Sequence, residues 1–221
     1  MKKKIILTII VASFLTFFIY KHVYHEKINI VTLGDGISTG ETAYDVTGYS
    51  FNDYLRDYYE ENQTVEEYIT EFSRKGETTE TLKTKISNNY TLESTNTKIQ
   101  QALAEAKILR IAIGMDELNQ KNLKSKQIDQ YLENIDKILT VIRIYNNKAI
   151  FLIGLYPTSS LNKEKVREIN QRLKELCAKH QVTYIDIENI SENQEYFFDS
   201  NSYYLNYKGH RYISEQIQSF L

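Results

Sequence analysis

The chain reads Ile28-Asn-Ile-Val-Thr-Leu-Gly-Asp-Gly-Ile-Ser-Thr-Gly40 near its N-terminal third. Apolar, mostly β-branched residues run from 28 to 33 and stop at Gly34, a pattern typical of a strand that is buried on both faces. A second run of this kind covers 108–113 and also stops at a glycine, Gly114. Strands buried on both faces occur in parallel sheets that helices cover, so these two runs predict an α/β fold.

Strand and helix patterns alternate along the rest of the chain. Strands are expected at 28–33, 65–72, 108–113, 149–155 and 182–187, and helices at 49–61, 78–86, 95–106, 125–145, 163–179 and 206–220. This alternation predicts a three-layer α/β/α domain with a five-stranded parallel sheet. Such sheets bind ligands beyond the carboxyl ends of their strands, so function is expected in the loops after residues 33, 72, 113 and 155 and before the last helix.

The N-terminal segment has the pattern of a membrane anchor. Three lysines at 2–4 precede an apolar run over 5–20, and Lys21 and His22 close it. We expect a cytoplasmic tail at 1–4, a transmembrane signal anchor at 5–22 and an extracytoplasmic domain over 26–221. The run is short for a span and no small-x-small cleavage site follows it, so a cleaved signal peptide with secretion is the alternative.

Composition narrows the function classes. The chain has 221 residues, a length that fits one domain plus an appendage. Its formal net charge of −2 excludes a strong positive electrostatic field that would attract nucleic acid. The single Cys177 excludes an internal disulfide and reads as a buried apolar residue. No pattern in the sequence predicts a cofactor.

Five segments in order resemble the sequence blocks of the SGNH (GDSL) hydrolases, a family of serine esterases and lipases. Residues 31–40 are similar to the G-D-S block, 76–79 (Gly-Glu-Thr-Thr) to N-x-G-x-x-G, and 113–118 to G-x-N-D. Residues 155–157 match a turn after the fourth strand, and 201–210 are similar to D-x-x-H-x-N-x-x-G. The resemblance covers about residues 28–220 and implies the flavodoxin-like fold of that family, with ester hydrolysis by a serine.

The positions that the resemblance assigns to catalysis carry other residues. The nucleophilic serine corresponds to Gly36, which has no oxygen with which to attack an ester. The acid and the base correspond to Asn201 and Tyr204. A phenol is a poor base at neutral pH, and an amide cannot stabilise an imidazolium as a carboxylate does.

The oxyanion hole implied by the resemblance is altered as well. Its glycine corresponds to Ser73, which still has a backbone N–H, and its asparagine corresponds to Asp116. An ionised carboxylate at that position would repel an oxyanion instead of stabilising it. These changes together predict a domain that is not a serine esterase.

Two other chemistries stay open. Ser38, two residues after Gly36, is the alternative nucleophile of a divergent esterase or deacylase, and His210 is its only plausible base. With the strand order 2-1-3-4-5, Asp35, Asp116, Glu117 and Asp199 would gather oxygen ligands of the kind that Ca²⁺ or Mg²⁺ prefers. No recognised ligand spacing is present, so no metal site is predicted. His180 lies at the end of an expected helix, where the helix dipole favours a positive charge, so a structural role is predicted for it.

The favoured hypothesis is a membrane-anchored binding or scaffolding module at the cell envelope. Its remnant cleft would hold an envelope glycan, an acyl chain or a protein segment. Tyr203, Tyr204 and Tyr207 suit such recognition, because amphipathic rings offer a large contact area, although packing against the last helix would explain them equally well.

Overall fold

The computed structural model describes residues 27–61, 64–199 and 202–221. Its sheet consists of β1 (Lys27–Gly34), β2 (Thr64–Ile69), β3 (Ile108–Ala112), β4 (Ala149–Ile153) and β5 (Thr183–Ile185). The five strands are parallel and lie in the order β2-β1-β3-β4-β5. The predicted five-stranded parallel sheet is therefore confirmed, and its strand order is the 2-1-3-4-5 order considered above.

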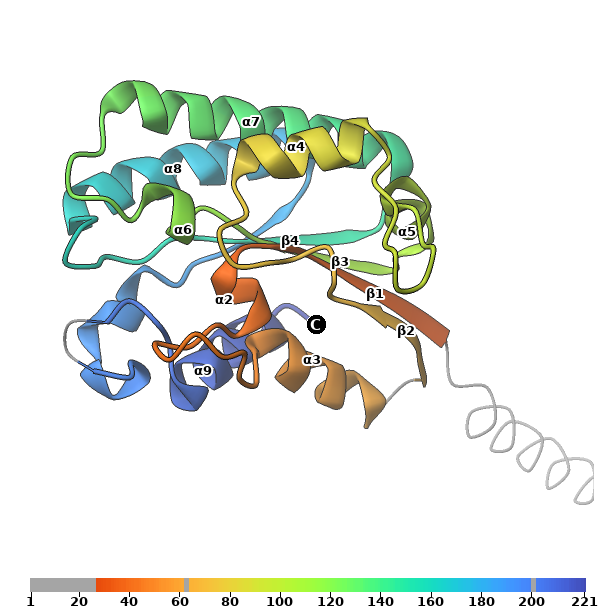
Figure 1. Cartoon of the computed structure of the whole chain (residues 1–221), viewed down its shortest axis with the longest axis horizontal. Coiled ribbons are helices and arrows are strands. Elements are labelled where there is room, and N and C mark those ends of the chain that lie inside the picture. The colour runs from red at the N-terminus through yellow and green to blue at the C-terminus, as the bar shows by residue number, and fades with distance from the viewer. Residues whose placement is uncertain (1–26, 62–63, 200–201) are drawn as a thin grey trace, which may run out of the picture.

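Helices cover both faces of the sheet (Figure 1). One face carries α3 (Phe51–Glu60) and α9 (Tyr207–Gln218), which pack against each other. The other face carries α4 (Thr79–Ser87), α5 (Ile99–Glu105), α7 (Ser125–Tyr145) and α8 (Lys163–His180). Two short helices, α2 (Gly36–Thr39) and α6 (Met115–Leu118), follow β1 and β3, and two 3₁₀ turns, Glu188–Glu192 and Gln194–Tyr196, follow β5. The domain therefore has the predicted three layers.

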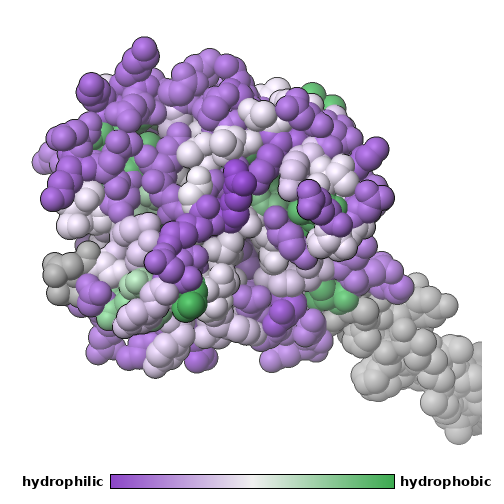
Figure 2. Space-filling view, viewed as in Figure 1, coloured by the Kyte–Doolittle hydropathy of each residue, from purple (hydrophilic) through white to green (hydrophobic). Residues whose placement is uncertain are grey.

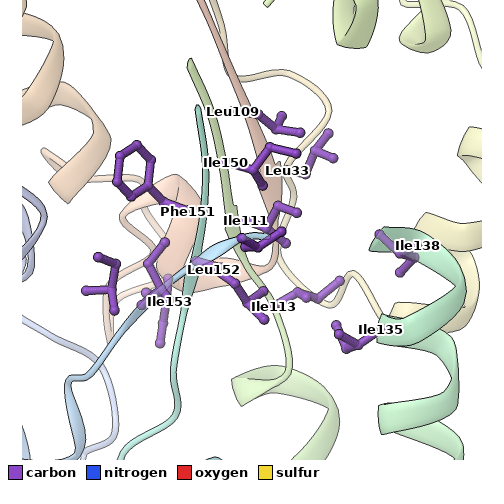
Figure 3. Close-up of a cluster of buried hydrophobic side chains, with 14 of the residues drawn as sticks. Leu33, Leu109, Ile111, Ile113, Ile135, Ile138, Ile150, Phe151, Leu152 and Ile153 are labelled. Carbon is purple, nitrogen blue, oxygen red and sulfur yellow. The ribbon is translucent and has the colours of Figure 1, made fainter. Parts of the chain in front are cut away.

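The apolar core lies between the sheet and its helices, and the face of the molecule shown in Figure 2 is mostly hydrophilic. All five residues of β3 are buried, as are Ile30, Val31 and Leu33 of β1. Figure 3 shows side chains of β1, β3 and β4 facing Ile135 and Ile138 of α7. Burial on both faces of the central strands is the physical reason for their continuous apolar runs.

Several element boundaries differ from the predicted ones. β4 stops at Ile153 because the backbone of Leu155 bonds to the Asn170 side chain, with 2.9 Å contacts at both its N–H and its carbonyl. The helix expected over 95–106 begins only at Ile99, since Thr91 and Lys98 first form an antiparallel bridge. Neither contact leaves a trace in the hydrophobic periodicity of the sequence.

The predicted tail at 1–4 and membrane anchor at 5–22 lie outside the described residues. Within the described ranges, no helix is both long enough and apolar enough to cross a membrane.

Candidate functional site

The candidate site lies where β1 and β3 end side by side, and Asp35 connects the two ends. One carboxylate oxygen of Asp35 accepts the N–H of Ile37 at 3.3 Å and caps α2. The other accepts the N–H groups of Gly114 (2.8 Å) and Asp116 (3.1 Å). Asp35 is fully buried, and this burial, together with the charge of Asp116, raises its pKa to about 7.

Asp116 at the start of α6 occupies the centre of the site. Its Oδ2 accepts the backbone N–H of Gly36 at 3.1 Å and that of Gly76 at 2.7 Å. Its Oδ1 accepts the hydroxyl of Tyr203 at 3.3 Å. Two N–H groups that converge on one oxygen form an anion-binding site, and here the protein's own carboxylate fills it.

Gly36 begins α2 directly beneath this carboxylate. A Cβ atom added to Gly36 would lie 3.1 Å and 3.3 Å from the two Asp116 oxygens and 3.2 Å from the Cβ of Glu41. A side chain at position 36 would therefore press against Asp116, and the small size of glycine is what lets the carboxylate approach.

Gly76 is a site residue that the sequence reasoning missed, because it assigned the oxyanion glycine to Ser73. The Ser73 N–H donates to the Thr70 carbonyl at 2.9 Å, and its hydroxyl bonds with those of Thr32 (3.4 Å) and Ser38 (3.1 Å). The assignment of this donor to Ser73 is therefore corrected, because the Ser73 N–H is already bonded in the turn that follows β2. In the sequence, the glycine of Gly-Glu-Thr-Thr was the signal that could have identified the donor. In the structure it has a φ of +73°, a conformation that glycine adopts readily.

Ser38 and His210 are not brought together. The Ser38 hydroxyl is buried and bonds to the hydroxyl of Ser73 and to the Asn52 amide, at 3.1 Å and 3.2 Å. The Nδ1 of His210 accepts the Phe51 N–H at 3.3 Å, and its Nε2 is buried without a partner among the described residues. Burial lowers the pKa of His210 to about 4, so the ring is neutral near pH 7.

Two adjacent tyrosines border the site. The rings of Tyr203 and Tyr204 stack with centroids 4.3 Å apart, and the Lys75 Nζ lies 5.8 Å from the centroid of Tyr204. Lys75 also pairs with Glu41 at 3.0 Å and with Asp45. Burial raises the pKa of Tyr203 well above its usual range. Tyr204, the position assigned to the base, therefore contacts an aromatic ring and a lysine, while Asn201 lies outside the described residues.

The carboxylates considered as metal ligands point to different partners. Glu117 accepts the backbone N–H of Thr79 at 2.8 Å, and Asp199 accepts the Ser202 N–H at 2.8 Å. Across the described ranges, no group of three or more His, Cys, Asp or Glu side chains is arranged to hold a metal ion. Of these four acidic residues, hydrogen bonds in the described part of the chain directly join only Asp35 and Asp116. Cys177 is buried in α8, and burial raises the pKa of its thiol to about 12.

The fold and the site define a class: a three-layer α/β domain with an anion-binding site at the carboxyl ends of β1 and β3. The model of the GDSL-like Lipase/Acylhydrolase family matches residues 32–212. Because this match spans most of the sequence, the chain belongs to the GDSL-like lipase/acylhydrolase family.

Several solved structures of similar fold are named as esterases or lipases. The lipase/acylhydrolase from Enterococcus faecalis is 14% identical with a TM-score of 0.63, covering 87% of this chain and 94% of that one. The psychrotrophic esterase EstA from Pseudoalteromonas sp. is 15% identical with a TM-score of 0.62, covering 86% and 94%. At these identities the likeness shows the fold alone. A search of the curated proteins finds no match to this chain.

Proposed function

We propose that this chain is a binding or scaffolding module of the GDSL fold, without serine esterase activity, held at the outer face of a membrane. One observation carries the proposal: the Asp116 carboxylate accepts the N–H groups of Gly36 and Gly76. In an ester hydrolase of this fold, such donors would bind the oxygen on which negative charge develops.

The charge of Asp116 opposes that chemistry. Two unit negative charges 4 Å apart repel each other by about 4 kcal/mol at an effective dielectric constant of about 20. A missing oxyanion donor alone costs roughly 3 kcal/mol. A carboxylate in that place, with glycine at the position assigned to the nucleophile, favours binding over hydrolysis.

The location rests on the N-terminal sequence. Three lysines, an apolar run over 5–20 and then Lys21 and His22 are the order expected of a signal anchor with its positive end in the cytoplasm. On this reading the domain from residue 26 lies outside the cell, at its envelope.

The ligand would contact the two tyrosines beside Asp116. Tyr203 and Tyr204 are half-buried and stacked, and the Tyr203 hydroxyl donates to Asp116. Tyr207, at the start of α9, is 64% exposed and lines a depression with Tyr49 and Phe198. Such rings suit an envelope glycan, an acyl group or a protein segment.

A divergent esterase that uses Ser38 is the competing hypothesis, and the names of the structural neighbours favour it. Its hydroxyl, however, has polar partners in Ser73 and Asn52 and no bond to His210 within the described chain. A buried serine that is not hydrogen-bonded to a base is not activated as a nucleophile.

The decisive experiment is labelling of the full-length chain with a fluorophosphonate serine probe, beside an assay with short-chain esters. We expect no labelling and no hydrolysis by the native chain. The control is Ser38→Ala; labelling that appears in the native chain and disappears in this variant would overturn the proposal.

A second arm tests why activity is absent. The variant Gly36→Ser, Asp116→Asn, Asn201→Asp and Tyr204→His carries all four family side chains, and Gly36→Ser alone is its matched control. Hydrolysis by the quadruple variant and not by the single one would support the loss of these groups as the cause.

A further inference from the structure

The point at which the described domain begins limits how it can sit on a membrane. β1 starts at Lys27, at the amino edge of the sheet, and the candidate site lies at the opposite, carboxyl edge. In Figure 1 the amino ends of the strands gather at the right, and α2 and α6 lie toward the other end. Any tether that precedes Lys27 therefore joins the domain at the end far from Asp116.

The tether is short compared with the domain. Seven Cα–Cα steps lead from the end of the apolar run at residue 20 to Lys27, and they reach at most about 25 Å when fully extended. The seven steps of β1, from Lys27 to Gly34, extend over about 23 Å. To bring the carboxyl edge onto the bilayer, Lys27 would have to stand about 23 Å above it, which requires a tether that is almost fully extended and costs conformational entropy.

Helix ends that lead back to the sheet form a fixed surface at the amino edge. Arg143, near the end of α7, donates to the carbonyls of His180 (2.8 Å), Lys148 (2.9 Å) and Gln181. The Asn146 amide donates to the carbonyls of Leu103 and Ala106, at 2.7 Å and 2.8 Å. These bonds join the ends of α5, α7 and α8 to the start of β4.

Large apolar and aromatic side chains are exposed on this surface. Ile144 is 74% exposed and Tyr145 is 36% exposed at the end of α7, and Tyr90, which follows α4, is 41% exposed. Lys148, the residue directly before β4, is exposed. Tyrosine rings and lysine side chains with their apolar stems are suited to the headgroup region of a bilayer.

We propose that the domain stands on the bilayer with its amino edge, defined by Tyr90, Ile144, Tyr145 and Lys148, against the lipid headgroups. The Asp116 site then faces away from the membrane. This proposal rests on the membrane tether of the proposed function and deepens it. The ligand comes from the aqueous or wall side, and lipids of the same bilayer cannot reach the site.

The test uses the full-length chain in nanodiscs of phosphatidylglycerol and phosphatidylcholine. In a Cys177→Ser background, a fluorophore is attached at Ile144→Cys on the amino edge or at Ser159→Cys, an exposed position after β4 at the carboxyl edge. Spin-labelled headgroup lipids quench fluorophores close to the membrane. We expect quenching at least threefold stronger at position 144 than at 159.

The outcomes separate the two proposals. Equal quenching, or stronger quenching at 159, with the chain retained in membranes washed in alkaline carbonate would overturn the orientation and leave the tether intact. Release of the chain by that wash would overturn the tether and the orientation together. Neither result bears on esterase activity, which the serine probe measures separately.

Discussion

At the residue scale, the identity of residue 116 sets the charge of the site. An asparagine would present an amide, whereas Asp116 places a carboxylate against two backbone N–H groups and the Tyr203 hydroxyl. Its charge also acts on Asp35, whose pKa burial has already raised. One substitution thus changes which charge the site tolerates and how a buried neighbour titrates.

We predict that Asp116→Asn makes stability less dependent on pH. The folded-state pKa of Asp35, about 7, exceeds its ordinary value of 3.8, so Asp35 destabilises the fold progressively as pH rises from 4 through 7. Removing the charge of Asp116 lowers that pKa in part, because burial remains. Urea unfolding at pH 4.5, 6 and 7.5 measures the free energy of unfolding. Its decline from pH 4.5 to 7.5 should be smaller in Asp116→Asn than in the native chain by about 1 kcal/mol.

Glu117→Gln is the matched control for this experiment, because the Glu117 carboxylate bonds to Thr79 and not to Asp35. The free energy of unfolding of Glu117→Gln should decline between pH 4.5 and 7.5 as much as that of the native chain. An unchanged decline in Asp116→Asn would contradict the proposed coupling between the two aspartates.

At the element scale, two glycines shape the turns that build the site. Gly114 ends the segment after β3 at a φ of +121°, and Gly76 precedes α4 at +73°. A Cβ atom at Gly114 would lie 2.6 Å from the ring of Tyr131, whereas one at Gly76 would meet nothing within 4 Å. The first position needs glycine for both conformation and space, and the second for conformation only.

Substitution of each glycine by alanine should therefore separate the cost of backbone strain from the cost of steric overlap with Tyr131. We expect Gly76→Ala to lower the free energy of unfolding by about 1 kcal/mol through backbone strain. Gly114→Ala adds overlap with Tyr131, which is fully buried, and should cost about 3 kcal/mol. Chemical denaturation of both variants checks the order; equal losses would show that Tyr131 moves aside freely.

At the scale of the whole molecule, a buried arginine lies between the sheet and α3. Arg110 of β3 is 1% exposed, and its Nη1 donates to the Asn52 carbonyl at 3.3 Å. Its Nε and Nη2 have no partner among the described residues, and burial lowers its pKa to about 10. The Tyr68 ring, 5.9 Å away, offers partial compensation.

Arg110→Met should therefore leave the melting temperature unchanged or raise it, since methionine fills similar space without an unpaired charge. Arg110→Ala is the matched comparison and should cost about 3 kcal/mol through the cavity that it leaves. Thermal unfolding of the two variants is the measurement. A loss in Arg110→Met as large as in Arg110→Ala would mean that the charge itself stabilises this layer.

The fold and two residues of the site, Gly36 and Asp116, were predictable from the sequence. The apolar runs that end at Gly34 and Gly114 predicted the central strands, and the ordered blocks pointed to Gly36 and Asp116. The boundaries of β4 and α5 were not predictable, because single contacts such as that of Asn170 with Leu155 set them. Gly76 was missed because its N–H matters only once the chain is folded against α6.

The sequence by itself determined the layered α/β architecture and the absence of a hydroxyl at position 36. Hydrophobic periodicity is a local property, and so is the presence or absence of an oxygen atom. Only the tertiary structure decided that Asp116 fills the anion-binding site, that Ser38 and His210 bond elsewhere, and that β1 begins at the edge opposite the site. Each of these depends on which atoms meet in the folded chain, and residues 35–80 positions apart in the sequence meet only through the fold.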